Sequence, residues 1–296
     1  MAKLNLLGLA LGLFQVASGL AVGQAGKAAP DVAAYGPRKN VPVVALVDLG
    51  QAVSYAAVSR DSISGSGSLS VLKGNVAVAS PGTSIYGFPP NKIFGTKDDP
   101  GSPRAVIAYN AASLAYTNAA SRPNGIPISG TIGAGTMFPP GVYRWTNGGV
   151  AGLNAYLDGA LILDGQNNPK SVFIFQIPAN LFVGTYTQVT VALKNKASAC
   201  NVFWQVEGYV YLGYQTLFAG NILANGYITA SYATKVEGGL YSVTSGITLY
   251  DATVSREGCD KPKEKPKWGH DDDGDDDDEK DEWKKGHEGK NDEEED

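Results

Sequence analysis

Both histidines of this 296-residue sequence, His270 and His287, lie near its C-terminus. The 259 residues that precede Asp260 therefore cannot hold a Ser-His-Asp triad or a histidine-based metal site. The sequence also has no phosphate-binding glycine loop, no paired CxxC cysteines and no nucleic-acid-binding motif. We expect no cofactor, no metal site and no nucleic-acid partner.

Carboxylates are the remaining groups that could act as a catalytic acid and base. Asp98 with Asp99, and Asp158 with Asp164, could flank a glycosidic bond in a polysaccharide-cleaving enzyme. The first pair precedes Pro100-Gly101, however, and the second pair bounds a strand, so turn and cap roles are favoured. The sequence thus predicts that the protein is not an enzyme and has no catalytic residues.

The stretch from Cys200 to Ser255 repeats at a step of 18 residues. Apolar and polar residues alternate within each repeat, which predicts short strands with one side turned inward. A fixed period of this length is typical of a three-sided solenoid, whose stacked coils place matching residues about 4.8 Å apart. Function should therefore be sought in outward-facing columns of side chains. The recurring residues are Tyr214, Tyr232 and Tyr250; Phe218, Val236 and Val254; Gly220 and Gly238; and Tyr209 and Tyr227.

One long helix is predicted ahead of this stretch, over residues 103–122. Ser102 is a good N-cap, Pro103 suits the first helical position, and no Gly or further Pro follows before Pro123. Apolar residues at steps of three or four predict that one helix face packs against the solenoid. That stripe comprises Val106, Tyr109, Ala112, Tyr116 and Ala120.

Apolar runs predict several buried strands outside the repeats. Residues 43–47, 172–177 and 202–206 are almost continuously apolar, which suits parallel strands buried on both faces. With few helix-forming segments, the composition favours one all-β domain over residues 43–259 that includes the helix.

The two ends of the sequence differ from this body. Residues 1–21 have a basic start, an apolar run and small residues at a cleavage point, which predicts a signal peptide and a secreted, extracellular protein without a membrane span. We expect residues 22–42 to form a flexible lead-in. The low-complexity tail 260–296 carries 18 acidic residues against eight lysines, so it is expected to be disordered and could attract cations or basic surfaces.

The only two cysteines are Cys200 and Cys259. In an oxidising compartment they could form a disulfide that ties the last coil back to an earlier one. Two unpaired buried thiols are the alternative.

Several strands of the body are similar to those of a known family. The segments 137–145, 172–177, 201–206 and 218–224, together with the helix end 115–122, resemble the secreted microbial ice-binding (antifreeze) proteins. The resemblance extends from about Val47 to Ser255. It implies a discontinuous right-handed β-solenoid of triangular section with one long α-helix packed alongside, and adsorption to ice crystals through a flat face.

The resemblance also implies candidate ice-contact positions. Many members of the family place Thr at the first and fourth positions of a four-residue segment that precedes a core Val or Phe. An ice-binding face should be flat, rigid, regular and free of strong charges. Four segments of this sequence correspond to the family's segment, and only two of their eight first and fourth positions keep Thr. The candidate residues are Thr185, Gln188, Tyr214, Leu217, Tyr232, Lys235, Tyr250 and Thr253.

The tyrosines at three of these positions support an alternative function. Tyr214, Tyr232 and Tyr250 would stack up an outer face as flat apolar rings with polar tips. Such a surface suits sugar rings, so the alternative is an adhesive protein that binds cell-wall polysaccharide. The same tyrosines could instead contribute only to sheet stability through contacts between neighbouring strands.

Overall fold

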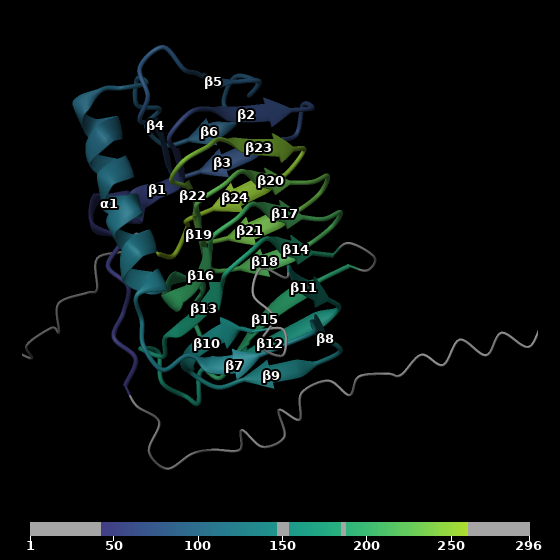
Figure 1. Cartoon of the computed structure of the whole chain (residues 1–296). Helices are drawn as coiled ribbons and strands as arrows, with labels where there is room; N and C mark the ends of the chain where they lie inside the picture. The colour runs from purple at the N-terminus through teal and green to yellow at the C-terminus, as the bar shows by residue number, and fades with distance from the viewer. Residues whose placement is uncertain (1–42, 147–153, 185–187, 260–296) are drawn as a thin grey trace, which may run out of the picture. The chain divides into compact units, whose positions relative to one another are not determined.

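The computed structural model describes residues 43–146, 154–184 and 188–259. The predicted signal peptide, the lead-in, the acidic tail and the candidate Thr185 lie outside the described residues. Within the described residues the chain forms three eight-stranded parallel sheets and a single α-helix. Each turn of the chain contributes one short strand to each sheet, so the predicted β-solenoid is confirmed (Figure 1).

Two coils precede the helix and six follow it. The first two coils are β1 (Tyr55–Ser59), β2 (Ile63–Ser66) and β3 (Val71–Lys73), then β4 (Asn75–Val78), β5 (Ile85–Tyr86) and β6 (Ile93–Phe94). The first three coils after the helix are β7 (Ile126–Ile128), β8 (Thr131–Gly133) and β9 (Thr136–Phe138); β10 (Gly141–Trp145), β11 (Ala155–Asp158) and β12 (Ala160–Asp164); and β13 (Phe173–Ile177), β14 (Leu181–Val183) and β15 (Thr190–Lys194). The last three are β16 (Val202–Val206), β17 (Val210–Leu212) and β18 (Leu217–Ala219); β19 (Asn221–Ala224), β20 (Ile228–Ala230) and β21 (Lys235–Glu237); and β22 (Leu240–Ser242), β23 (Ile247–Tyr250) and β24 (Thr253–Ser255).

The stack is discontinuous in sequence. The order of sheet A is β4-β1-β22-β19-β16-β13-β10-β7, and sheets B and C, which start at β5 and β6, follow the same scheme. After β6 the helix carries the chain to the far end of the stack, and the later coils return until β22, β23 and β24 pair with β1, β2 and β3 (Figure 1). Coils from the two ends of the body therefore meet inside the stack, at a place we call the junction.

The helix α1 (Pro103–Ala120) lies along the outer face of sheet A (Figure 1). Ser102 caps it by accepting a hydrogen bond from the backbone N–H of Ala105, as predicted, and it ends two residues before the predicted Arg122. The predicted apolar stripe is wrong in part, because only Ala112 of its members is fully buried. The centre of the contact is a row of alanines, which lets the helix approach the sheet closely, and Tyr109 and Tyr116 border it. The buried row is Ala105, Ala108, Ala112, Ala115 and Ala119.

Most of sheet A is buried on both faces. The residues of β13 and β16 are all buried, since alternate side chains pack into the solenoid and against the helix. This confirms the buried strands predicted at 172–177 and 202–206. The run at 43–47 is not a strand, however, and the Val43 side chain is 98% exposed.

Aromatic rings fill the centre of the solenoid core. Phe175 stacks on Trp204 with ring centroids 4.1 Å apart, and Tyr143 stacks on the other side of Phe175 at 5.3 Å. The indole N–H of Trp204 donates to the Ala219 carbonyl at 3.1 Å, so its polar atom is satisfied without water. These stacks join successive coils and hold the sheets at fixed spacing.

Cys200 and Cys259 form a disulfide, with Cα atoms 5.4 Å apart. Cys200 belongs to a single 3-10 turn (Ala199–Asn201) just before β16, and Cys259 follows β24. The bond ties the last coil back to an earlier one, as expected if the cysteines pair.

Candidate functional site

Two outer faces of the solenoid are free of the helix. Sheet A lies under α1, whereas sheets B and C turn one side of every strand outward. In sheet B the strands are short, and the middle residue of most of them points outward between two buried neighbours. In β20, for example, Ile228 and Ala230 are buried and Thr229 between them is half-buried.

One outward residue from each strand of sheet B belongs to a continuous column. The register of the parallel strands places these residues directly above one another, and neighbouring strands lie about 4.8 Å apart. From one end to the other, the sheet B column is Thr131, Tyr156, Phe182, Tyr211, Thr229, Thr248, Ser64 and Tyr86. None of these eight residues carries a charge.

One half of the sheet B column consists of hydroxyl side chains on three consecutive coils. Thr229, Thr248 and Ser64 are register partners, and the Ser64 hydroxyl donates to Thr248 Oγ1 at 3.1 Å across the junction. β-Branched threonine is stiff about χ1, so the methyl and hydroxyl groups are held in fixed directions. This part of the face combines regular spacing, small uncharged groups and a rigid backbone.

The neighbouring part of the column is aromatic. Tyr156 stacks on Phe182 with centroids 5.3 Å apart and planes 11° apart, and Tyr211 follows on the next coil. Tyr209, at the start of the Tyr211 strand, meets Phe182 edge-on at 5.4 Å. Bulky rings make this half less even than the hydroxyl half.

The candidate residues predicted from the sequence lie beside this column, around the edge between sheets B and C. Tyr214 and Tyr232 occupy the turns that join the two sheets, and Tyr250 is the last residue of β23. The three tyrosines hold equivalent positions, because each precedes a residue with a left-handed backbone conformation. The left-handed residues are Gln215, Ala233 and Asp251.

The remaining described candidates face outward from sheet C or from its entrance. Leu217, Lys235 and Thr253 are register partners at the first positions of β18, β21 and β24. Gln188 precedes β15 and donates from its amide to the Gln215 carbonyl at 3.1 Å. The predicted set therefore forms two columns on either side of an edge and does not share one plane.

Sequence reasoning missed the sheet B column because the repeat is not uniform. Lys235 and Thr253 are paired at a separation of 18 residues, whereas Thr229 and Thr248 are paired at 19. An alignment of the coils at a constant step of 18 residues, based on the core Val and Phe residues of sheet C, therefore places the last strand of sheet B one residue out of register. The available signal was the lone outward residue between two buried ones in each sheet B strand.

Two of the three tyrosine rings at the edge stack on each other. Tyr214 and Tyr232 have centroids 5.7 Å apart and planes 10° apart. Parallel rings at that distance overlap, so each covers part of the face of the next. Sugar binding needs open ring faces, and the observed stacking instead fits the contribution to sheet stability. The adhesive alternative gains no support from this geometry.

Replacing Tyr214, Tyr232 and Tyr250 together by Thr tests the role of the tyrosines. We expect a folded protein whose free energy of unfolding falls by about 0.5–1.5 kcal/mol for the lost Tyr214–Tyr232 stack. We expect ice activity to be kept, because the change leaves the sheet B column intact. Retention on insoluble chitin, glucan and cellulose should stay at background for both proteins, and a loss of retention in the variant would revive the adhesive alternative.

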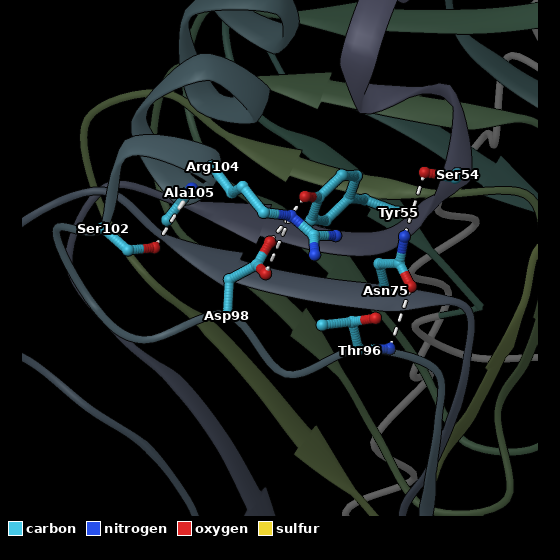
Figure 2. A network of polar contacts seen from close by, with 8 residues as sticks. All are labelled: Ser54, Tyr55, Asn75, Thr96, Asp98, Ser102, Arg104 and Ala105. Carbon is cyan, nitrogen blue, oxygen red and sulfur yellow. Dashed lines mark hydrogen bonds and ion pairs between the residues drawn. The ribbon is translucent and has the colours of Figure 1, made fainter.

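The first carboxylate pair has a structural role. Asp98 is 5% exposed, accepts a hydrogen bond from the Tyr55 hydroxyl at 2.5 Å and lies 3.4 Å from Arg104 Nε (Figure 2). It thereby joins β1 to the first turn of α1, next to the Ser102 cap. Asp99 is exposed, and its carbonyl accepts from the Ser102 N–H at 3.0 Å.

The second carboxylate pair contains a turn residue. Asp164 accepts from the Gln166 N–H at 2.9 Å and from the Asn195 amide at 2.7 Å. The contacts of Asp98, Asp99 and Asp164 thus fit the structural roles favoured by the sequence. Within the described residues, no group of three or more His, Cys, Asp or Glu side chains could hold a metal ion.

Alkaline pH should destabilise the protein through one buried and one half-buried tyrosine. Burial raises the pKa of Tyr55 above 10.0, and its bond to Asp98 adds to the effect; burial likewise raises the pKa of Tyr116. The raised pKa means that the folded state favours the neutral hydroxyl. The contribution of these two tyrosines to the free energy of unfolding is therefore fully present below about pH 10 and is lost as the pH rises through their higher folded-state pKa values. Thermal unfolding between pH 8 and 11.5 should show the fall, and a Tyr55→Phe, Tyr116→Phe double variant should show a smaller one. An equal fall in both proteins would contradict this origin.

The described residues thus form a discontinuous three-sided solenoid with a helix on one sheet and an uncharged column of side chains on another. The sequence matches the ice-binding-like family over residues 57–255. Because this match spans most of the chain, the protein belongs to that family.

Individual relatives agree with this assignment. An ice-binding protein of Nostoc sp. is 29% identical over 218 residues, covering 73% of this chain and 77% of the relative. An ice-binding protein of Flavobacterium frigoris is 35% identical over 156 residues, covering 51% of this chain and 52% of the relative. The crystal structure of an ice-binding protein from the Antarctic ascomycete Antarctomyces psychrotrophicus is similar with a TM-score of 0.64 and 30% identity, covering 71% of this chain and 98% of that one.

Within the described residues, no helix is both long enough and apolar enough to cross a bilayer.

Proposed function

We propose that this protein is a secreted ice-binding protein that adsorbs to ice through the outer face of sheet B and slows ice growth or recrystallisation. Family membership supports ice as the ligand. The observation that carries the choice of face is the sheet B column, whose eight outward residues are uncharged and lie in register on parallel strands. We propose that the hydroxyl half, Thr229, Thr248 and Ser64, makes the main contact.

Sheet C suits this role less well. Its outward column Leu217, Lys235 and Thr253 mixes apolar, cationic and hydroxyl groups, and Glu237 and Lys73 add charge nearby. Charged groups orient water strongly around themselves, which disturbs an ice-like array. The edge residues Tyr214, Tyr232 and Tyr250 would border the contact without forming its centre.

The mechanism requires no chemistry. A rigid face that holds water in a regular array binds to an advancing crystal plane, and the ice front then curves between adsorbed molecules, which opposes further growth. We propose that export places the protein where extracellular ice forms. The apolar run of residues 4–14 after Lys3 supports this, and so does the Cys200–Cys259 disulfide, which is typical of oxidising compartments.

An ice-recrystallisation assay on the purified chain without residues 1–21 tests the proposal. Parallel pull-downs on ice, chitin, glucan and cellulose identify the surface that is bound. We expect inhibition of recrystallisation and enrichment in the ice fraction only. Binding to a glycan with no effect on ice would reject the proposed function.

A further inference from the structure

The hydroxyl half of the sheet B column is built from both ends of the body. Thr229 and Thr248 belong to the last two coils, whereas Ser64 belongs to the first coil. The three residues line up only because β2 pairs with β23 across the junction. A segment that is remote in sequence must therefore be held in register for the column to be continuous.

Arg256 occupies the point where the last coil ends and the first coil begins. It follows β24 directly, and its side chain is 1% exposed. Its Nε donates to the Val53 carbonyl at 3.0 Å, and Val53 lies in the 3-10 turn Gly50–Ser54 immediately before β1. This bond joins the exit of the last coil to the start of the first.

The same guanidinium also reaches an earlier coil. A terminal nitrogen of Arg256 donates to the side-chain oxygen of Asn221, the first residue of β19. The Asn221 amide in turn donates to the carbonyls of Cys200 at 3.2 Å and of Val202 at 3.1 Å. Because Cys200 is bonded to Cys259, a covalent link and a hydrogen-bonded chain meet at one place.

We propose that Arg256 is a positioning residue that sets the register of the first coil on the last and so keeps Ser64 in line with Thr248 and Thr229. Its planar guanidinium is suited to this, since its fixed fork can bond two acceptors on separate segments at once. Burying a cation costs free energy unless the cation is well hydrogen-bonded. A buried Arg256 at the junction therefore fits a role in specifying a single register of the first coil on the last. The link to ice adsorption rests on the proposed function, whereas the effect on register does not.

Amide hydrogen exchange in Arg256→Met and Arg256→Lys variants tests the register. The amides of Ile247, Asp251 and Val71 donate across the junction to Ser62, Ser66 and Ala252. We expect them to exchange about ten-fold or more faster in both variants, because a buried bond to a charged donor is lost and a single ammonium cannot bridge both acceptors. The amides of Val210 and Gln215, which donate to Tyr227 and Tyr232 in the later coils, should exchange at their wild-type rates.

Lys73→Met is the matched control. The ion pair of Lys73 with Glu257 also spans the junction, at 3.0 Å, but the two side chains are 37% and 68% exposed, and ion pairs that are open to solvent contribute little. We expect wild-type exchange in this variant. A general loss of stability would accelerate amide exchange throughout the protein. Faster exchange of the junction amides alone, with unchanged exchange in the later coils, therefore identifies Arg256 as a positioning residue.

Ice-recrystallisation inhibition near 0 °C should fall in the Arg256 variants and persist in Lys73→Met. Wild-type protection of the junction amides in a folded Arg256 variant, or equal acceleration in all coils, would overturn the inference. If Arg256→Met does not fold, the lysine variant provides the same comparison. If the wild-type protein has no ice activity, the proposed function fails, and the exchange data still decide the role of Arg256.

Discussion

Replacing Thr248 by lysine is expected to lower ice-recrystallisation inhibition by about ten-fold or more, since each 1.4 kcal/mol lost from adsorption is a factor of ten in affinity. Thr248 stands in the middle of the hydroxyl half of the sheet B column, between Thr229 and Ser64. A long charged side chain at that position would hold the face away from the crystal, so the contacts of both neighbours would weaken together.

The physical reason is the flatness of the contact. A crystal plane cannot adapt to a protruding group in the way a protein partner can. Thr248→Lys also removes the hydroxyl oxygen that accepts the hydrogen bond from Ser64, although the Ser64 hydroxyl and the lysine ammonium group can then both bond to water. We therefore expect the loss to appear in adsorption and only weakly in the free energy of unfolding.

Thr190→Lys is the control for this prediction. Thr190 is a half-buried outward residue of β15 in sheet C, so the two variants make the same chemical change on different faces. Recrystallisation inhibition and thermal unfolding should be measured on both, and only Thr248→Lys should lose ice activity. If only Thr190→Lys lost activity, the contact would have to be assigned to sheet C.

Replacing Trp204 by alanine should give the largest loss of stability. The ring is fully buried, stacks on Phe175 at 4.1 Å and packs against Phe218 at 5.1 Å. Large-to-small changes of a buried tryptophan or phenylalanine cost about 3–5 kcal/mol. The change also leaves the Ala219 carbonyl without its indole donor, which adds to the cost.

Urea unfolding with tryptophan-independent detection, such as far-ultraviolet circular dichroism, measures this loss. Tyr214→Ala provides the comparison, because Tyr214 is 54% exposed and its ring stacks on Tyr232 at the surface. We expect the exposed change to cost about 0.5–1.5 kcal/mol, the value of an aromatic pair. Similar losses in the two variants would show that the aromatic core does not dominate the stability of the solenoid.

Local signals in the sequence accounted for most of the fold. Ser102 and Pro103 located the start of the helix, because capping and a fixed φ act within one turn of chain. The apolar runs 172–177 and 202–206 identified strands buried on both faces, and Cys200 with Cys259 proved to be a pair. Local patterns were weaker for the packed face of the helix, where close approach favours Ala108 over the more hydrophobic Tyr109.

The repeat indicated columns of side chains, and Tyr214 and Tyr232 do stack. The eight candidate contact residues themselves stay a prediction. The sheet B column was not found from the sequence because, in the last coil, the turn from sheet A to sheet B is a residue longer and the turn from sheet B to sheet C a residue shorter, so the pairing of Thr229 with Thr248 departs from the common step.

The sequence by itself determined a stacked, three-sided β-fold and the absence of histidine chemistry from its body, because periodicity and residue type are properties of the chain. Only the tertiary structure placed Ser64 beside Thr248, since that pairing joins segments separated by most of the body and is made by backbone bonds that carry no sequence signal. The same holds for Arg256, whose place in the sequence gave no indication of burial at the junction.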